Sequence, residues 1–139
     1  MEDSKTQMRG FLLDTAIFLW SLSSTERLNR QATALLEDAT TELFLSAASS
    51  WEISIKSALG KLKLPEAAST YVPKRLRSHG IRSLPISQIH ALAAGELPRH
   101  HRDPFDRMLI AQAASEDMVL MTADPSFKKY GIEIVWCAR

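Results

Sequence analysis

The feature that most constrains this chain is the alternation of short apolar runs with longer stretches of helical periodicity. The apolar runs lie at residues 11–13, 43–45, 81–84, 118–121 and 132–136. Between them, apolar residues recur at spacings of three and four, as in helices with one buried face. Short buried strands separated by helices predict a largely parallel sheet covered on both faces. We therefore expect an α/β fold whose mostly parallel central sheet has about five strands flanked by helices.

The expected helices are marked by capping residues and by the apolar spacing. They lie near residues 25–38, 49–59, 72–78, 87–95 and 103–117, with a further helix beginning near Ala16. Ser24, Ser87 and Asp103 stand where side-chain caps are expected, and Gly60 stands where a helix is expected to end.

The composition is that of an ordinary globular chain, with 45% hydrophobic and 24% charged residues in 139. We expect one domain over residues 1–139, with residues 1–8 as a flexible N-terminal extension. A net charge of +1 excludes binding of nucleic acid by bulk charge alone. Because Cys137 is the sole cysteine, no internal disulfide forms. With no apolar segment of a signal-peptide or membrane-spanning kind, a cytoplasmic protein without membrane attachment is expected.

Acidic residues follow several of the expected strands, where ligands gather in open α/β sheets. Asp14 ends the first strand, Glu52 lies on the helix after the second, and Asp124 follows the fourth. Each also has a purely structural interpretation. Asp14 suits a helix cap, Asp124 suits an aspartate-initiated turn, and Glu52 stands four residues before Lys56.

Asp106 is the most informative of these acids. Asp103 suits the N-cap of its helix, with Pro104 first and Asp106 third, as in a capping box. The positions three, four and seven residues after Asp106 are all apolar: Leu109, Ile110 and Ala113. Asp106 therefore heads a buried stripe, where a carboxylate is costly unless it is paired or bound to a metal.

Four acids packed together repel one another unless a cation lies among them. Mg²⁺ or Mn²⁺, which prefer oxygen ligands, are the expected ions. Such a site is typical of phosphodiester hydrolysis, in which activated water attacks phosphorus and leaves a 5′-phosphate and a 3′-hydroxyl. Without these four acids, 12 acidic residues face 17 basic ones, a surplus that suits a polyanionic substrate.

Four segments of the chain resemble PIN-domain ribonucleases, and among them the VapC-type toxins of type II toxin–antitoxin pairs. The segments, in family order, are LLDT (12–15), SWEISIK (50–56), HRDPFDRMLIAQA (101–113) and TADPSF (122–127). The resemblance implies a PIN-like three-layer sandwich and a metal-dependent endoribonuclease. One position departs from the pattern, because Ala16 stands where many relatives have histidine.

The resemblance also assigns roles to individual residues. It implies that the metal-binding and catalytic acids are Asp14, Glu52, Asp106 and Asp124. The auxiliary residues implied are Thr15, Ser50, Asp103 and Thr122, of which we interpret Asp103 as structural and expect Ser49 to share the role of Ser50. The basic residues expected to contact RNA are Lys56, Arg102 and Arg107.

Partners follow from the same resemblance. It implies an RNA substrate, a small cognate antitoxin that covers the site, and a homodimer. The residues considered as surface anchors for such contacts are Trp20, Trp51, Leu62 and Leu64.

Other classes fit the sequence less well. A haloacid-dehalogenase phosphatase requires a second aspartate where Ala16 stands, and the His100-His101 pair lacks the partners of a zinc site. A flap-cleaving DNA nuclease needs more acids and additional helices. The main alternative is a catalytically silent PIN-fold module that binds RNA or protein, against which the presence of all four acids speaks.

Overall fold

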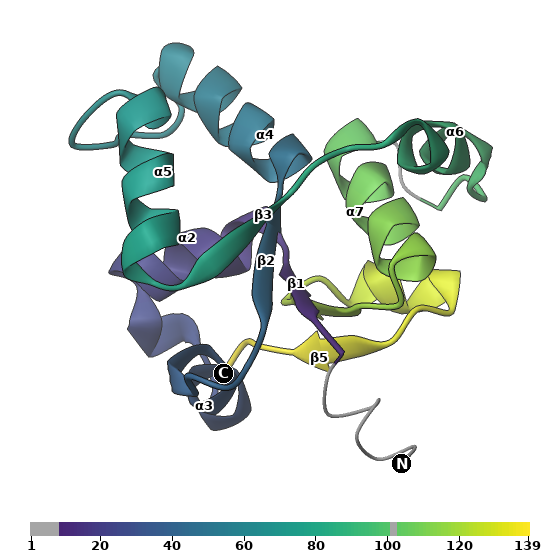
Figure 1. Ribbon diagram of the computed structural model, residues 1–139, viewed down its shortest axis with the longest axis horizontal. Helices are drawn as coiled ribbons and strands as arrows, with labels where there is room; N and C mark the ends of the chain where they lie inside the picture. The colour runs from purple at the N-terminus through teal and green to yellow at the C-terminus, as the bar shows by residue number, and fades with distance from the viewer. Residues whose placement is uncertain (1–8, 101–102) are drawn as a thin grey trace.

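The computed structural model describes residues 9–100 and 103–139, so the extension expected at residues 1–8 lies outside the described residues. Within these ranges, one sheet has the strand order β3-β2-β1-β4-β5 (Figure 1). The strands are β1 (Phe11–Leu13), β2 (Leu43–Ser46), β3 (Ile81–Leu84), β4 (Val119–Thr122) and β5 (Ile134–Trp136). Every neighbouring pair is parallel, which confirms the predicted α/β class.

The centre of the sheet is β1, in which Leu12 and Leu13 are buried and Phe11 is partly buried. Leu12 pairs with Phe44 of β2 on one side and with Leu120 of β4 on the other. Leu12 and Leu13 are both 0% exposed and point to opposite faces, as successive strand residues must. Leu13 joins the core beneath one helical layer and Leu12 joins the core beneath the other.

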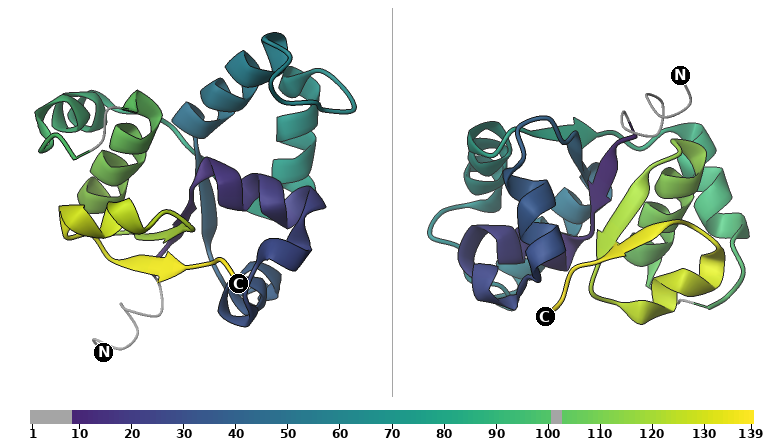
Figure 2. Two further views of the ribbon diagram at one scale, coloured as in Figure 1. Left: turned by 180° about the vertical axis from the view of Figure 1, so that it is seen from behind. Right: turned by 90° about the horizontal axis from the view of Figure 1, so that it is seen from below.

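Helices cover both faces of the sheet. They are α2 (Thr15–Ser23), α3 (Arg30–Glu37), α4 (Ala47–Ala58), α5 (Ala68–Ser78), α6 (Gln88–Glu96) and α7 (Pro104–Ser115), with 3₁₀ turns η1 (Thr25–Arg27) and η2 (Pro125–Tyr130). In Figures 1 and 2, α2 to α5 lie on one side of the sheet, whereas α7 and η2 lie on the other with α6 beside α7. This arrangement is the predicted three-layer sandwich. None of the helices in the described ranges is both long and apolar enough to cross a bilayer.

The single helix predicted at residues 25–38 is wrong in its first half. The chain forms the short η1 turn, passes through Leu28 in extended conformation, and begins α3 only after Asn29. The Asn29 side chain accepts a hydrogen bond from the Ala32 amide and donates to the carbonyl of Trp136, while Leu28 bridges to Ala138. Contacts with the distant C-terminal segment therefore override the local helical pattern.

Helix α4 begins two residues before its predicted start, because the Ser46 hydroxyl accepts a hydrogen bond from the Ala48 amide. It ends as predicted near Gly60, which has a φ of +74°. The predicted Ser87 cap is confirmed and is completed by His90, whose ring accepts a hydrogen bond from the Ser87 amide.

Candidate active site

The four predicted acids come from segments that meet at the carboxyl edge of the sheet. Asp14 follows β1, Glu52 lies on α4 after β2, and Asp124 follows β4 by two residues. Asp106 lies in the first turn of α7, and α7 contacts α4. Because all strands run in the same direction, the ends of β1, β2 and β4 are neighbours (Figure 1).

Asp14 combines the capping role expected of it with a buried position in the acidic group. Its Oδ1 accepts a hydrogen bond from the Ile17 amide at 2.8 Å, and its Oδ2 accepts one from Thr122 Oγ1 at 2.5 Å. Burial raises the pKa of the Asp14 carboxyl to about 6. The charges of Asp124 and Glu52 add to this rise, so both lie close enough to repel Asp14.

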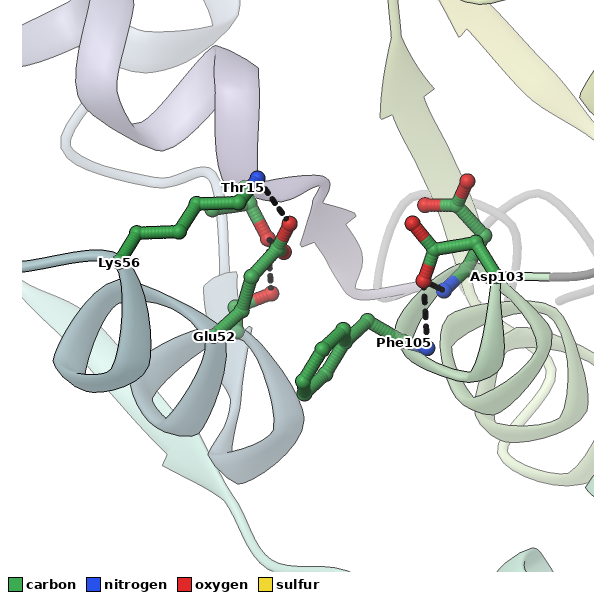
Figure 3. Close-up of polar contacts among 7 residues, drawn as sticks. Thr15, Glu52, Lys56, Asp103 and Phe105 are labelled. Carbon is green, nitrogen blue, oxygen red and sulfur yellow. Dashed lines mark hydrogen bonds and ion pairs between the residues drawn. The ribbon is translucent and has the colours of Figure 1, made fainter. Parts of the chain in front are cut away.

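Glu52 is held by a chain of polar contacts between α2 and α4. Thr15 Oγ1 donates to Glu52 Oε1 at 2.7 Å and is hydrogen-bonded to Ser49 Oγ at 2.9 Å. Lys56 Nζ lies 2.7 Å from Glu52 Oε2, so the expected i, i+4 ion pair also forms (Figure 3). Glu52 is nevertheless only 8% exposed, which makes it more than a surface ion-pair partner.

Asp106 stands at the head of the buried stripe, as its sequence position predicted. The stripe residues Leu109, Ile110 and Ala113 are each 1% exposed. Among the described residues, no hydrogen bond or ion pair reaches the Asp106 carboxylate, in contrast to Asp14 and Glu52. Burial raises the pKa of Asp106 to about 7. Negative charges contribute to this rise in the order Asp103, Glu52, Asp124 and Asp14.

Thr122 connects Asp14 to the loop that carries Asp124. While its hydroxyl donates to Asp14, the same oxygen accepts a hydrogen bond from the Asp124 amide at 3.0 Å. Asp124 Oδ1 accepts from the amide and the hydroxyl of Ser126 at 2.9 and 2.6 Å, which is the predicted aspartate-initiated turn. The turn fixes the Asp124 carboxylate beside the other acids.

Asp103, Ser49 and Ser50 make different contacts in the structure. Asp103 caps α7 by accepting from the Phe105 and Asp106 amides, as predicted (Figure 3). The Glu52 network runs through Ser49, and the structure shows no such contact for Ser50. Ser49 is therefore the serine that supports Glu52, a choice that the adjacent serines left open in the sequence.

The structure gives Arg107, a predicted RNA contact, a set of backbone contacts that the sequence did not predict. Its guanidinium donates to the backbone carbonyls of residues 94, 95, 97 and 98 at 2.8–3.4 Å, so it holds the end of α6 against α7. Its donors face the backbone because the chain turns back over α7 after α6. Arg102 lies outside the described residues, and Lys56 remains a predicted RNA contact.

Arg107→Gln is expected to lower the free energy of unfolding by about 2 kcal/mol, since charged donors to backbone carbonyls are lost. RNA affinity of the folded variant should stay within about twofold, because the guanidinium N–H groups that would bind a phosphate already donate to backbone carbonyls. Thermal unfolding and RNA titration check both points. Loss of RNA affinity without any loss of stability would instead show that Arg107 contacts RNA.

The expected surface anchors divide into one exposed and three packed residues. Trp51 is 62% exposed, whereas Trp20, Leu62 and Leu64 pack in part against the core. The ring centroid of His100 lies 5.1 Å from that of Tyr130.

The donor set of this edge fits a hard divalent cation. The available groups are carboxylate oxygens, and burial, with a smaller contribution from neighbouring negative charges, raises the pKa values of Asp14 and Asp106. Lys56 is the nearby cation: its pKa is raised by the Glu52 hydrogen bond and also by the charges of Asp103 and Asp106. Across residues 9–100 and 103–139, however, no three acidic, histidine or cysteine side chains already stand in a metal-holding group.

The PIN-domain family matches residues 11–133 of this chain. Since that match spans most of its length, the chain belongs to the PIN-domain family. Ribonuclease VapC16 of Mycobacterium tuberculosis is 44% identical over 57 residues, which are 41% of this chain. The chain spans 40% of the length of that relative.

Solved structures agree with this family. VapBC2 from Rickettsia felis, bound to a DNA fragment from its promoter, superposes with a TM-score of 0.70 at 16% identity, covering 91% of this chain and 98% of the other. FitAcB from Neisseria gonorrhoeae gives 0.63 at 21% identity, with 89% and 95% covered. A toxin–antitoxin complex from Klebsiella pneumoniae gives 0.58 at 18% identity, with 91% and 96% covered. At these identities the likeness establishes the fold.

Proposed function

We propose that this protein is a divalent-metal-dependent endoribonuclease and the toxin of a toxin–antitoxin pair. The observation that carries the proposal is the convergence of Asp14, Glu52, Asp106 and Asp124 from four separate segments at the carboxyl edge of the sheet. Four acids from separate segments, one without a hydrogen-bonding partner among the described residues, form a site that is disfavoured unless a cation binds.

Each side chain has a defined task in this site. Asp14 and Asp106 supply the central ligand oxygens, while Glu52 and Asp124 complete the acidic wall. Thr122 fixes the orientation of Asp14, and Thr15 fixes that of Glu52. A bound divalent ion supplies Lewis-acid chemistry for hydrolysis, activating water and stabilising the leaving oxygen.

The all-oxygen donor set favours Mg²⁺ or Mn²⁺ over metals that prefer nitrogen or sulfur ligands. A protein nucleophile is not required. Cys137, the only thiol, is fully buried, and burial raises its pKa to about 12, so it stays protonated at neutral pH.

RNA is the proposed substrate. The similarity to Ribonuclease VapC16 supports this proposal. Lys56 and Arg102 are proposed to contact the phosphates, and such a substrate implies activity in the cytoplasm. The toxin–antitoxin complex among the similar structures supports a small antitoxin that covers the site. We also propose a homodimer, which light scattering of the purified chain tests.

Incubation of the purified protein with single-stranded RNA tests the nuclease proposal. Cleavage is expected with Mg²⁺ or Mn²⁺ and not with chelator. It should give 5′-phosphate and 3′-hydroxyl ends, because water, and not the 2′-hydroxyl, attacks phosphorus while the bond to the 3′ oxygen breaks and that oxygen takes up a proton. Turnover that persists after complete chelation would contradict it.

The alternative is a catalytically silent module, and the described residues hold no three acidic, histidine or cysteine side chains in a metal-holding group. That module would bind RNA or protein with no metal-stimulated turnover under the same conditions. The two functions are therefore separated by a single titration of metal into a mixture of protein and RNA.

The toxin role has its own test. Expression of the chain alone is expected to arrest growth. Co-expression of its small cognate antitoxin, sought in an adjacent small gene, is expected to relieve the arrest. Unaffected growth in the presence of active enzyme would remove the toxin role and leave the nuclease proposal standing.

A further inference from the structure

An aromatic pair joins the two helices that carry Glu52 and Asp106. The ring of Trp51 on α4 lies edge-on to the ring of Phe105 on α7, with centroids 5.3 Å apart and an interplanar angle of 74°. Phe105 reaches from α7 toward α4 beside Glu52 (Figure 3). Each aromatic residue directly precedes one of the site acids in the sequence. The pair therefore bridges α4 and α7, and its Phe105 ring lies beside Glu52 (Figure 3).

The exposure of Trp51 is not explained by packing of the fold. Its side chain is 62% exposed, although tryptophan carries the largest apolar surface of any residue. Trp20, by contrast, packs against the core. A T-shaped contact covers at most one face of a ring, so the exposed Trp51 keeps open aromatic surface. Trp51 thus presents an aromatic surface in contact with Phe105, which itself lies beside Glu52 (Figure 3).

We propose that Trp51 stacks on a base of the RNA beside the phosphate that is cleaved, with Phe105 holding the indole in place. The inference rests on the proposed ribonuclease function and names the group that recognises the substrate. Unpaired bases in RNA are bound by stacking on aromatic side chains, and this contact tolerates different sequences because every base has a π-face.

The charge around the pair suits such an arrangement. Carboxylates repel the RNA backbone until a cation binds, so a neutral stacking surface beside them adds affinity without adding repulsion. Lys56, one turn after Glu52 on the same helix, offers a positive charge to a neighbouring phosphate. The contact of Trp51 with a base and that of Lys56 with a phosphate would then hold the RNA on either side of the acids.

A protein segment lying along α4 is the competing occupant. Trp51, Ile55 and Leu59 share one face of that helix, and Leu59 is also 63% exposed. Leu59 is eight residues from Trp51, about 12 Å along the helix axis. Trp51 differs from Ile55 and Leu59 because it also contacts Phe105, which lies beside Glu52 (Figure 3). We therefore favour RNA over a protein segment as the occupant.

The experiment measures affinity for single-stranded RNA of mixed sequence in chelator, where no cleavage occurs. Trp51→Ala should weaken binding about 10-fold, since stacking contributes about 5- to 150-fold per base. Leu59→Ala, at the equally exposed C-cap residue of α4, should bind as the parent does. Circular dichroism confirms that both variants fold.

Replacing Trp51 with an aromatic or an aliphatic residue separates stacking from general apolar contact. Trp51→Phe should retain most of the affinity, whereas Trp51→Leu should behave as Trp51→Ala does. Equal binding by the Phe and Leu variants would overturn the proposal and favour a protein-docking role.

Tryptophan fluorescence gives a readout that a structural role would not move. RNA should quench emission in the parent, in Trp20→Phe and in Trp136→Phe, and the quenching should be lost in Trp51→Phe. RNA that binds the parent without quenching Trp51 overturns this inference alone. A parent chain that binds no RNA either in chelator or with Mg²⁺ overturns the proposed function and this inference together.

Discussion

Asp106→Asn is expected to abolish RNA cleavage while raising the melting temperature of the metal-free protein. Asparagine keeps the size of the side chain but cannot balance the charge of a divalent ion, so turnover should fall more than about 100-fold. Stability should rise because burial and neighbouring acids disfavour the charged carboxylate, as its pKa of about 7 indicates.

The size of the stabilisation is limited by the partial exposure of Asp106. The full pKa change would correspond to several kcal/mol, and solvent screening reduces this to about 1–2 kcal/mol. The melting temperature should therefore rise by roughly 3–8 °C. Thermal unfolding in chelator and RNA cleavage in Mn²⁺ measure the two effects.

Asp117→Asn is the matched control, because Asp117 is exposed at the other end of α7 and asparagine tolerates its positive φ of 52°. It should alter neither cleavage nor stability appreciably, since only a surface contact to Arg9 is lost. Normal cleavage by Asp106→Asn would remove Asp106 from the proposed site.

The second large effect is the opposite response of the metal-free and metal-loaded proteins to pH. Asp14 and Asp106 have folded-state pKa values of about 6 and about 7, above those of unfolded aspartate. The folded chain therefore binds more protons than the unfolded chain between about pH 4 and pH 7. The destabilisation from these acids is absent at low pH and grows as the pH rises through their folded-state pKa values.

Two measurements follow from this sign. In chelator, the stability difference between the parent and Asp106→Asn should be largest near pH 8 and should shrink toward pH 5. The metal is held at 100 times the dissociation constant that applies at pH 8. The parent should then gain about 2.7 kcal/mol of stability at pH 8, and less at lower pH, where protons compete for the carboxylates. A difference between the two proteins that stays constant over this pH range would contradict the electrostatic account.

Much of the fold could be predicted from local sequence because its strands and helix caps use local rules. The apolar runs at Leu12 and Leu120 form the sheet centre, and the cap at Asp103 begins α7 as expected. The exception is the start of α3, where Asn29 binds carbonyls more than 100 residues away in the sequence. Such a contact leaves no trace in the spacing of nearby residues.

The candidate site was partly predictable for a related reason. Asp106 was recognisable because a carboxylate heads an apolar stripe, which is a local contradiction that requires an explanation. The roles of Arg107 and Ser49 depend on which backbone or side chain packs against them, and sequence spacing carries no such information. The aromatic contact between Trp51 and Phe105 likewise arises only when α4 and α7 are brought together.

The central claim is that the acids at this edge of the sheet bind a divalent ion. The most direct test is a crystal grown with Mn²⁺, in which anomalous scattering locates the ion. The account predicts an anomalous peak in contact with carboxylate oxygens of Asp14 and Asp106, with Glu52 or Asp124 also approaching it. A well-ordered site with no manganese between Asp14 and Asp106, or manganese bound only elsewhere, would contradict the account.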